Sequence, residues 1–175
     1  MRISVERVLL GAGDEHDLMR ARVALITLSR GEIDDPRTVI LLLRMRREMG
    51  LSQASRTDTL LKKARSGNLS LTEKAWAQLE LAHHSLTERN LREAIRELTR
   101  GLGYCWRAEV RAETLVLRGY TYLRLGEEQK AIADFHEVQL LSAPRRLLVQ
   151  AHVGRALAHA MRGDEAHLRS YESTS

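Results

Sequence analysis

The sequence is poor in the residues from which disulfides, sheets and membrane spans are built. Cys105 is the single cysteine, so no intramolecular disulfide can form, and the cytoplasm, a reducing compartment, is the expected location. Aromatic residues make up 4% of the chain and prolines number two, while strand-favouring residues are sparse beside Leu, Ala, Arg and Glu. The composition therefore favours helix throughout.

Long apolar runs are also absent. The longest, Val39 to Leu43, has five residues, whereas a helix needs about 20 apolar residues to cross a bilayer. Near the N-terminus, Glu6 and Arg7 interrupt the apolar core that a secretory signal requires. We therefore expect neither membrane association nor secretion. With 175 residues, of which 43% are hydrophobic and 29% charged, the chain is expected to form one soluble domain, residues 1–175.

Basic residues outnumber acidic ones, and the formal charge is +5. Only four of the 28 basic residues are lysine, and the arginines are spread along the chain with acids beside most of them. The densest cluster, Arg44-Met45-Arg46-Arg47, falls on a leucine-rich predicted helix and is interpreted as a solvated face. Scattered charge steers association without establishing it, so nucleic acid is disfavoured as the main ligand.

Glycine and proline divide the sequence at helix-sized intervals. Asp35 before Pro36 is typical of a helix start, and Ser70 with Glu73 has the spacing of a capping box. Before residue 70 the pattern predicts four helices, at about 4–10, 15–29, 35–49 and 53–65. After it, the pattern predicts three helix pairs: 71–87 with 91–102, 108–125 with 128–141, and 145–161 with 164–171.

These pairs repeat at an interval of 37 residues, the strongest signal in the sequence. Small residues recur at Ala82, Gly119 and Ala156, where paired helices need a close approach. The other positions that keep this spacing are the apolar set Leu79, Val116 and Val153, the pairs Ala94 with Ala131 and Leu98 with Phe135, and the turns Arg89-Asn90, Gly126-Glu127 and Gly163-Asp164.

The clearest unit, Ala112 to Pro144, resembles the tetratricopeptide repeat. The matching residues are Leu115, Gly119, Tyr122, Gly126, Ala131, Phe135 and Pro144, whereas Arg118 stands where the family has leucine. Tyr122 and Phe135 are expected to be buried between the paired helices. The resemblance implies an all-α fold of stacked helical hairpins in a right-handed superhelix. Residues 71–171 would form about two and a half such repeats, the last a cap, after a less regular helical segment, 1–70. Sensor domains of large bacterial transcription activators are similar in texture, though less closely.

Sequence signatures of enzymes and metal sites are missing. There is no HExxH, GxSxG or P-loop, and Gly11-Ala12-Gly13 is interpreted as a helix stop. The seven histidines form no ligand set, and no base is identifiable beside Cys105. We therefore expect no catalysis, no metal and no cofactor.

The resemblance instead implies a groove lined by the first helix of each hairpin. The positions that the family turns inward are Trp76, Leu79, His83 and Thr87 in one unit, Glu113, Val116, Tyr120 and Arg124 in the next, and Gln150, Val153, Leu157 and Met161 in the last. The Lys, Arg and Asn set with which some family members clamp a terminal carboxylate is not present. Because the predicted lining is mainly apolar and aromatic, it suits an amphipathic helix or a hydrophobic strand of another protein.

Two alternatives to this prediction stay open. Residues 1–70 could fold across the groove and fill it, which would make its lining plain core. The chain could also act as a regulatory module of a transcription or nucleic-acid-associated system, which requires arginines gathered on one exposed face. The function that the pattern favours is an adaptor or chaperone-like module that binds a protein segment, with self-association compatible with it.

Overall fold

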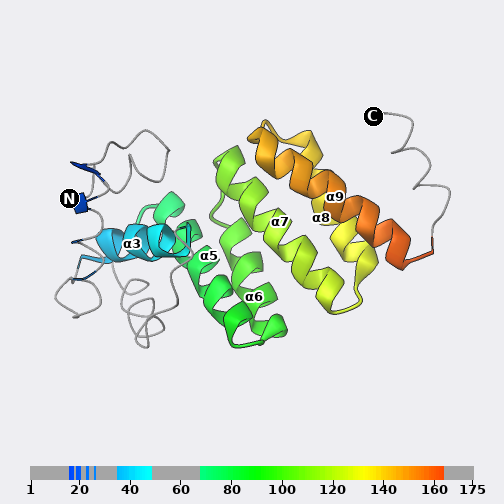
Figure 1. Ribbon diagram of the computed structural model, residues 1–175, viewed down its shortest axis with the longest axis horizontal. Helices are drawn as coiled ribbons and strands as arrows, with labels where there is room; N and C mark the ends of the chain where they lie inside the picture. The colour runs from blue at the N-terminus through cyan, green and yellow to red at the C-terminus, as the bar shows by residue number, and fades with distance from the viewer. Residues whose placement is uncertain are drawn as a thin grey trace.

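The computed structural model describes residues 35–48 and 68–163, together with His16, Asp17, Met19, Arg20, Val23 and Ile26. These residues are helical, with turns and no strand (Figure 1). The helices with continuous bounds are α3 (Pro36–Glu48), α5 (Leu71–Thr87), α6 (Leu91–Leu102), α7 (Ala108–Arg124), α8 (Glu128–Leu140) and α9 (Arg145–Met161). The prediction of an all-α chain is confirmed for this part. The helices predicted at 4–10, 53–65 and 164–171 lie outside it.

Local side-chain caps account for where several helices begin. Ser70 Oγ accepts from the Glu73 amide at 3.3 Å, and the Glu73 carboxylate accepts in return from the Ser70 amide at 2.9 Å, which closes the predicted capping box. Asp35 caps α3 by accepting from the Thr38 amide at 3.0 Å. Asn90 does the same for α6. Each cap satisfies an amide that the first helical turn leaves unpaired.

The turns that follow α5, α7 and α9 share one backbone conformation. Arg89, Gly126 and Gly163, which are 37 residues apart, have φ values of 58°, 71° and 75°. This left-handed region costs glycine little and strains a side chain such as that of Arg89. The repeat seen in the sequence is therefore present in the backbone as well.

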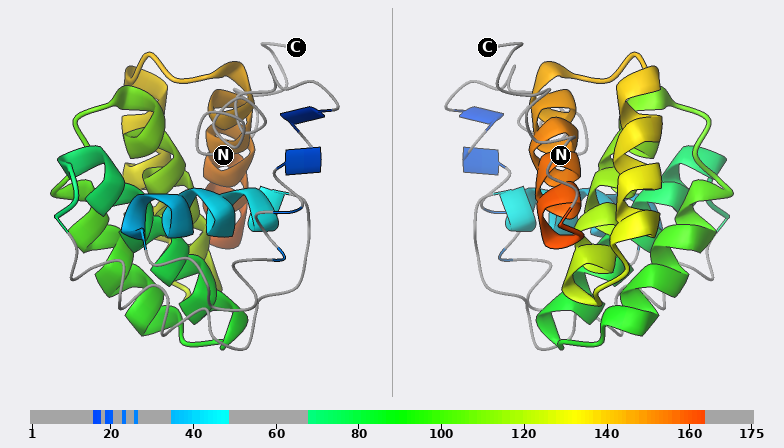
Figure 2. Two further views of the ribbon diagram at one scale, coloured as in Figure 1. Left: turned by 90° about the vertical axis from the view of Figure 1, so that its left-hand side faces the viewer. Right: turned by 90° about the vertical axis from the view of Figure 1, so that its right-hand side faces the viewer.

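Helices that are consecutive from α5 to α9 pack against each other, and α7 also contacts both α5 and α9. The helix α3 contacts α5 and, viewed from its own end of the molecule, runs crosswise in front of the later helices (Figure 2). None of the described helices combines the length and the apolar composition needed to cross a membrane.

Phe135 lies at the centre of the larger core, fully buried as predicted. A Cβ atom placed on Gly119 of α7 would lie 2.7 Å from its ring, and one on Gly154 of α9 would lie 2.4 Å away. Both are too close for any real contact, so glycine is required on both sides of the ring. Tyr122, predicted to be buried with Phe135, is half-buried instead, with Arg118 and Lys130 over its ring.

A second, smaller core repeats this arrangement. It consists of Leu79, Ala82, Ala94 and Leu98, which are the equivalents, 37 residues earlier, of Val116, Gly119, Ala131 and Phe135. Arg118, the departure from the family pattern, forms a fork with Asp134 through bonds of 2.8 Å and 2.7 Å and donates to Thr99 at 3.1 Å. It thereby ties α7 to α8 and α6 where leucine would offer only apolar contact.

Candidate binding surface

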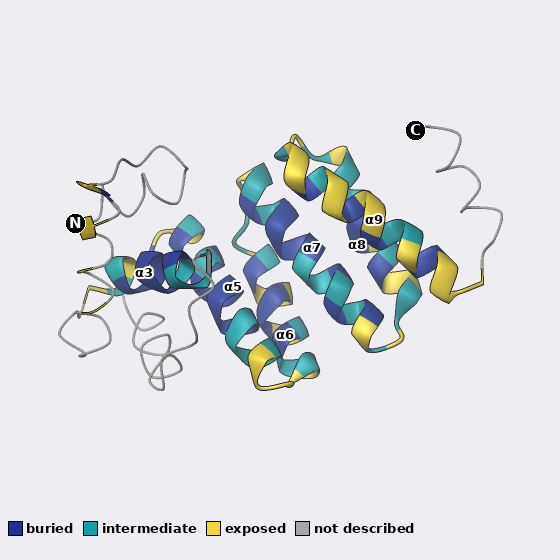
Figure 3. Ribbon diagram, in the orientation of Figure 1, coloured by how far each residue is buried: buried dark blue, intermediate teal, exposed yellow. Residues whose placement is uncertain are grey.

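The predicted groove residues divide into two regions of different exposure (Figure 3). The covered region consists of Trp76, Leu79 and His83 on α5 and Glu113 and Val116 on the first half of α7, all buried or half-buried. The open region consists of the half-buried Tyr120 together with the exposed Arg124, Gln150, Val153, Leu157 and Met161. Thr87, also predicted, is exposed at the C-terminal end of α5 and belongs to neither region. The structure thus places the other predicted residues in two sets rather than along one continuous groove.

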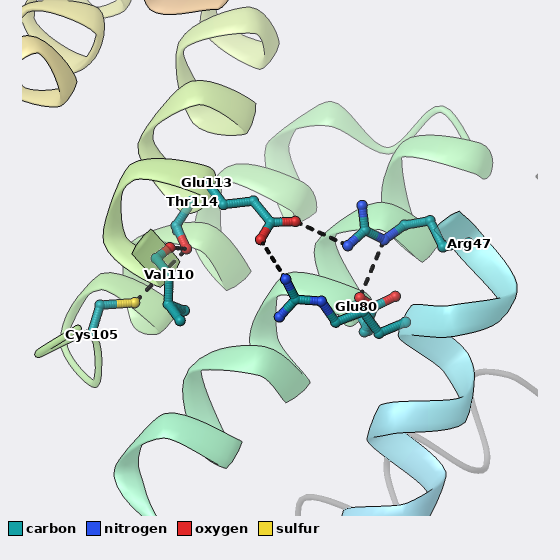
Figure 4. A network of polar contacts seen from close by, with 7 residues as sticks. Arg47, Glu80, Cys105, Val110, Glu113 and Thr114 are labelled. Carbon is teal, nitrogen blue, oxygen red and sulfur yellow. Dashed lines mark hydrogen bonds and ion pairs between the residues drawn. The ribbon is translucent and has the colours of Figure 1, made fainter. Parts of the chain in front are cut away.

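The covered region faces α3 through a set of arginine–carboxylate pairs. Glu113 of α7 binds Arg44 at 3.1 Å and Arg47 at 3.0 Å, and Arg47 also binds Glu80 of α5 at 3.2 Å. Figure 4 shows Glu113 and Glu80 turned towards Arg47 from two different helices. The guanidinium carbon of Arg44 lies 5.2 Å from the centre of the Trp76 ring. The helix α3 is therefore fastened to α5 and α7 together.

A fourth pair extends the contact towards the start of α5, where Arg37 binds Glu73 at 3.2 Å. Arg37, Arg44 and Arg47 are seven and three residues apart, which places them along one side of a helix. Glu73 and Glu80 are seven apart on α5, whereas their partners Arg37 and Arg47 are ten apart on α3. The sequence thus shows two rows of opposite charge but not how they pair.

The interpretation of Arg44-Met45-Arg46-Arg47 as a solvated face is wrong. The side chains of Arg44 and Arg47 keep only 11% and 21% of their exposure, and Met45 is fully buried. The five residues from Val39 to Leu43 are all buried too, so the middle of α3 is enclosed on every side. An arginine stripe on such a helix is paired inside the protein because an unpaired buried charge is very costly.

Burial in this cluster shifts two pKa values in opposite ways. Desolvation raises the pKa of Glu80 from 4.5 to about 7, and the Arg47 and Arg44 guanidinium groups only partly offset it. For His83, desolvation together with the same two arginines lowers the pKa from 6.5 to about 3. His83 is therefore neutral at pH 7, and Glu80 exchanges its proton near neutrality.

Leu79 and Val116 were predicted to line the groove, and the structure corrects both to core residues. Leu79 is buried in the smaller core, and Val116 keeps 6% of its exposure within the larger one. The alternative in which residues before 70 cover the surface describes Trp76 and Glu113, which α3 contacts, whereas the cores that hold Leu79 and Val116 contain no residue of α3.

The open region has an apolar stripe along α9. Val153 and Leu157 are 58% and 46% exposed, and Val149 and Met161 continue the stripe at 53% and 49%. The resemblance to the repeat family did not predict Val149 as a groove residue. The regular spacing of four residues from Val149 to Met161 in the sequence could have identified it. Four of the ten large hydrophobic residues that are exposed in the described part of the chain belong to this stripe.

Tyr120 joins α7 to this stripe. Its hydroxyl donates to the backbone carbonyl of Gln150 at 3.0 Å, and its ring meets Phe135 edge-on with centroids 5.1 Å apart. Both ends of the side chain are therefore fixed while it remains half-buried. An anchored aromatic ring beside exposed aliphatic side chains is typical of a protein-binding surface, because such a ring loses little entropy on binding.

Two observations concern the cysteine and the metal-ligating residue types. The Cys105 sulfur lies 3.8 Å from the Thr114 hydroxyl, and burial raises the pKa of the thiol, which makes it a poor nucleophile. Among these residues no group of three or more His, Cys, Asp or Glu side chains could hold a metal ion.

Comparison of the chain with protein-family profiles, with curated proteins and with solved structures finds no match.

Proposed function

We propose that the protein is a non-catalytic adaptor or chaperone-like module that binds a segment of another protein on its open region. One observation carries the proposal. Val116 and Val153 occupy the same position of the repeat, yet Val116 is buried and Val153 exposes more than half of its surface beside three further exposed apolar residues. A contiguous apolar patch exposed on a folded surface is the usual mark of an interaction site.

The repeat gives this surface its architecture. We infer that α5 to α9 form stacked hairpins of the tetratricopeptide-like kind, arranged as a right-handed superhelix. Support comes from the left-handed turns 37 residues apart and from the two cores built at equivalent positions. In such an arrangement the first helices of successive hairpins share one face, and α7 with α9 present Tyr120 and the apolar stripe on it.

Nucleic acid as the partner receives less support. Arg44 and Arg47, from the densest arginine cluster, bind carboxylates inside the protein and cannot also bind phosphates.

Site-specific photo-crosslinking tests the proposal directly. A photoreactive phenylalanine analogue replaces Leu157 on the open region or, as a matched control, Arg92 on the exposed side of α6. In extract from the cells that make the protein, we expect the same protein adducts to form repeatedly at position 157 and not at 92. If position 157 gives no protein adduct beyond that of position 92, the proposed function is wrong.

A further inference from the structure

The helix α9 differs from the other first helices in its charge. It contains Arg145, Arg146 and Arg155 and no Asp or Glu over its 17 residues. Arg145 and Arg146 are exposed at its start, and Arg124, also exposed, ends α7. By contrast, the carboxylates of Glu73, Glu80 and Glu113 dominate the polar groups of α5 and α7 that meet α3.

We call the exposed Arg124, Arg145 and Arg146 the basic rim, and the nearby carboxylates named below bind other residues. On α8, Asp134 binds Arg118 and Glu137 binds Arg111, while Glu127 before the helix binds Lys130. Among the described residues, Arg124, Arg145 and Arg146 take part in no ion pair. Their charge therefore faces solvent, on the same helix as the apolar stripe or on its neighbour α7.

The stripe has the dimensions of a helix contact. Val149, Val153, Leu157 and Met161 are spaced four apart, and twelve residues of helix extend about 18 Å. Arg146 precedes Val149 by three and Val153 by seven, so it lies at the head of the same side. A partner helix of three to four turns that carries its own apolar stripe would cover this surface.

The contact made by α3 shows that this protein already binds a helix by complementary charge. There an arginine stripe meets carboxylates on α5 and α7, next to the aromatic ring of Trp76. The open region has the same elements with the opposite sign: arginines, an aromatic ring and an apolar stripe.

We propose that the open region binds an acidic amphipathic helix of a partner protein, with its apolar residues on the α9 stripe and its carboxylates on Arg124, Arg145 and Arg146. This rests on the proposed function and adds the chemistry of the partner. A lipid bilayer fits this surface less well. Membrane-surface helices bury a broad apolar face, whereas one side of α9 already packs on Phe135 and only a single row of apolar residues remains exposed.

Two designed peptides test the charge of the partner in binding to the full chain. Each is a helix of about 16 residues with leucines at i, i+4, i+7 and i+11, flanked by glutamates in one and by lysines in the other. Fluorescence anisotropy should show the glutamate peptide binding at least about tenfold more tightly than the lysine peptide, with affinity that falls as salt is added. Equal affinity, or preference for the lysine peptide, would overturn the proposal.

Variants locate the site. Val153→Asp with Leu157→Asp should abolish binding of the glutamate peptide, and Arg145→Glu with Arg146→Glu should reverse the preference between the two peptides. The matched control, Arg92→Glu with Arg96→Glu on α6, should leave both affinities unchanged. Binding that survives the two aspartates, or an unreversed preference, would place the site elsewhere and overturn the proposal. Circular dichroism confirms that each variant is folded before its affinity is interpreted.

Other occupants give distinct results. Stronger binding to phosphatidylserine vesicles or to a DNA duplex than to the glutamate peptide, lost in the double-aspartate variant, would overturn the choice of a protein helix. Sedimentation that shows dimers abolished by the same variant would assign the stripe to a second copy. Tighter peptide binding after Leu168→Asp would assign it to the chain's own C-terminal segment. Protein adducts at position 157 without peptide selectivity would leave the proposed function standing and overturn only the acidic helix.

Discussion

The covered and open regions contain residues at equivalent positions of the repeat, but these residues are buried in the covered region and exposed in the open one. In the covered region α3 packs on α5 and binds Glu113 of α7, and the equivalents Leu79 and Val116 lie in the two helix cores. In the open region no described residue covers Val153, the next equivalent, and it stays exposed. The comparison teaches that repeat position sets the direction in which a side chain points, while burial depends on whether another element lies across it.

The two regions also differ in the sign of their charge. The carboxylates of the covered region are buried and matched to arginines of α3, so they contribute to folding. The arginines at the rim of the open region remain in solvent. Substitutions should therefore affect stability in the first region and binding in the second.

The largest contrast is expected between Val116→Glu and Val153→Glu, the same substitution at equivalent positions. Val116→Glu places a charge in the core and should lower the free energy of unfolding by about 4 kcal/mol or more. Val153→Glu should change it by less than about 0.5 kcal/mol, because the side chain already lies in solvent. Urea denaturation measures both, and similar losses in the two variants would break the distinction between the regions.

Removing a carboxylate from the covered region should have the next largest effect. Glu113→Leu leaves Arg44 and Arg47 without a shared partner and should cost about 3 kcal/mol. Adding Arg44→Met should recover much of that loss, since Arg47 still binds Glu80 and no unpaired arginine then remains. Arg124→Leu in the open region is the control and should cost less than about 0.5 kcal/mol. A double variant no more stable than Glu113→Leu would contradict the pairing.

The two sides of α9 give a sharper test within one helix. Gly154→Ala directs a methyl group into the Phe135 ring, at 2.4 Å from its nearest atom, and should cost about 2 kcal/mol. In a Phe135→Leu background the same change should cost at least about 1 kcal/mol less, because the ring is gone. Gly101→Ala, where the nearest atom is 3.2 Å away, is the control and should be milder. Additive losses at positions 154 and 135 would argue against this contact.

The smallest predicted effect concerns pH and is specific to the covered region. Folded Glu80 keeps its proton up to about pH 7, whereas the unfolded chain releases it near 4.5, so this group lowers stability as the pH rises between these values. Folded His83 stays neutral down to about pH 3, whereas the unfolded chain gains a proton below 6.5, so this group lowers stability as the pH falls. Between pH 4.5 and 6.5 the two slopes oppose each other and should nearly cancel.

Single substitutions should reveal the pH dependence of stability that each group contributes. In Glu80→Gln the His83 contribution remains, so the free energy of unfolding should rise with pH across that window by about 1 kcal/mol per pH unit. In His83→Asn it should fall by a similar amount. Denaturation midpoints at half-unit pH steps measure this, with Val153→Thr as a control that should follow the native chain. If stability depends on pH in the same way in the native chain, Glu80→Gln, His83→Asn and Val153→Thr, burial does not shift the pKa values of Glu80 and His83.

Local features of the sequence were sufficient to place the helices after residue 70. The predicted bounds 71–87, 91–102 and 145–161 agree with the structure, and the other two described helices end one residue earlier than predicted. Helix ends depend on signals a few residues long, such as the box of Ser70 and Glu73 or the glycines at 126 and 163, and these can be read without tertiary information.

The candidate surface was predictable only in part. Helical spacing correctly brought Val153, Leu157 and Met161 to one exposed side. It could not show that Arg44 and Arg47 are paired, because Glu113 lies more than sixty residues away in the sequence. It also missed the approach of Gly154 to Phe135, because the small residue that the repeat spacing marks on this helix is Ala156.

The sequence by itself determined that the described residues are helical and that the turns after α5, α7 and α9 recur every 37 residues, because turns, caps and helical periodicity act over short distances. Only the tertiary structure decided which side of each first helix is core and which is surface. A valine at a repeated position carries no information about a helix arriving from elsewhere in the chain. Packing between the helices buried Val116 in the larger core and left Val153 in solvent, while the arginines of α3 pair with carboxylates of α5 and α7, of which α9 has none.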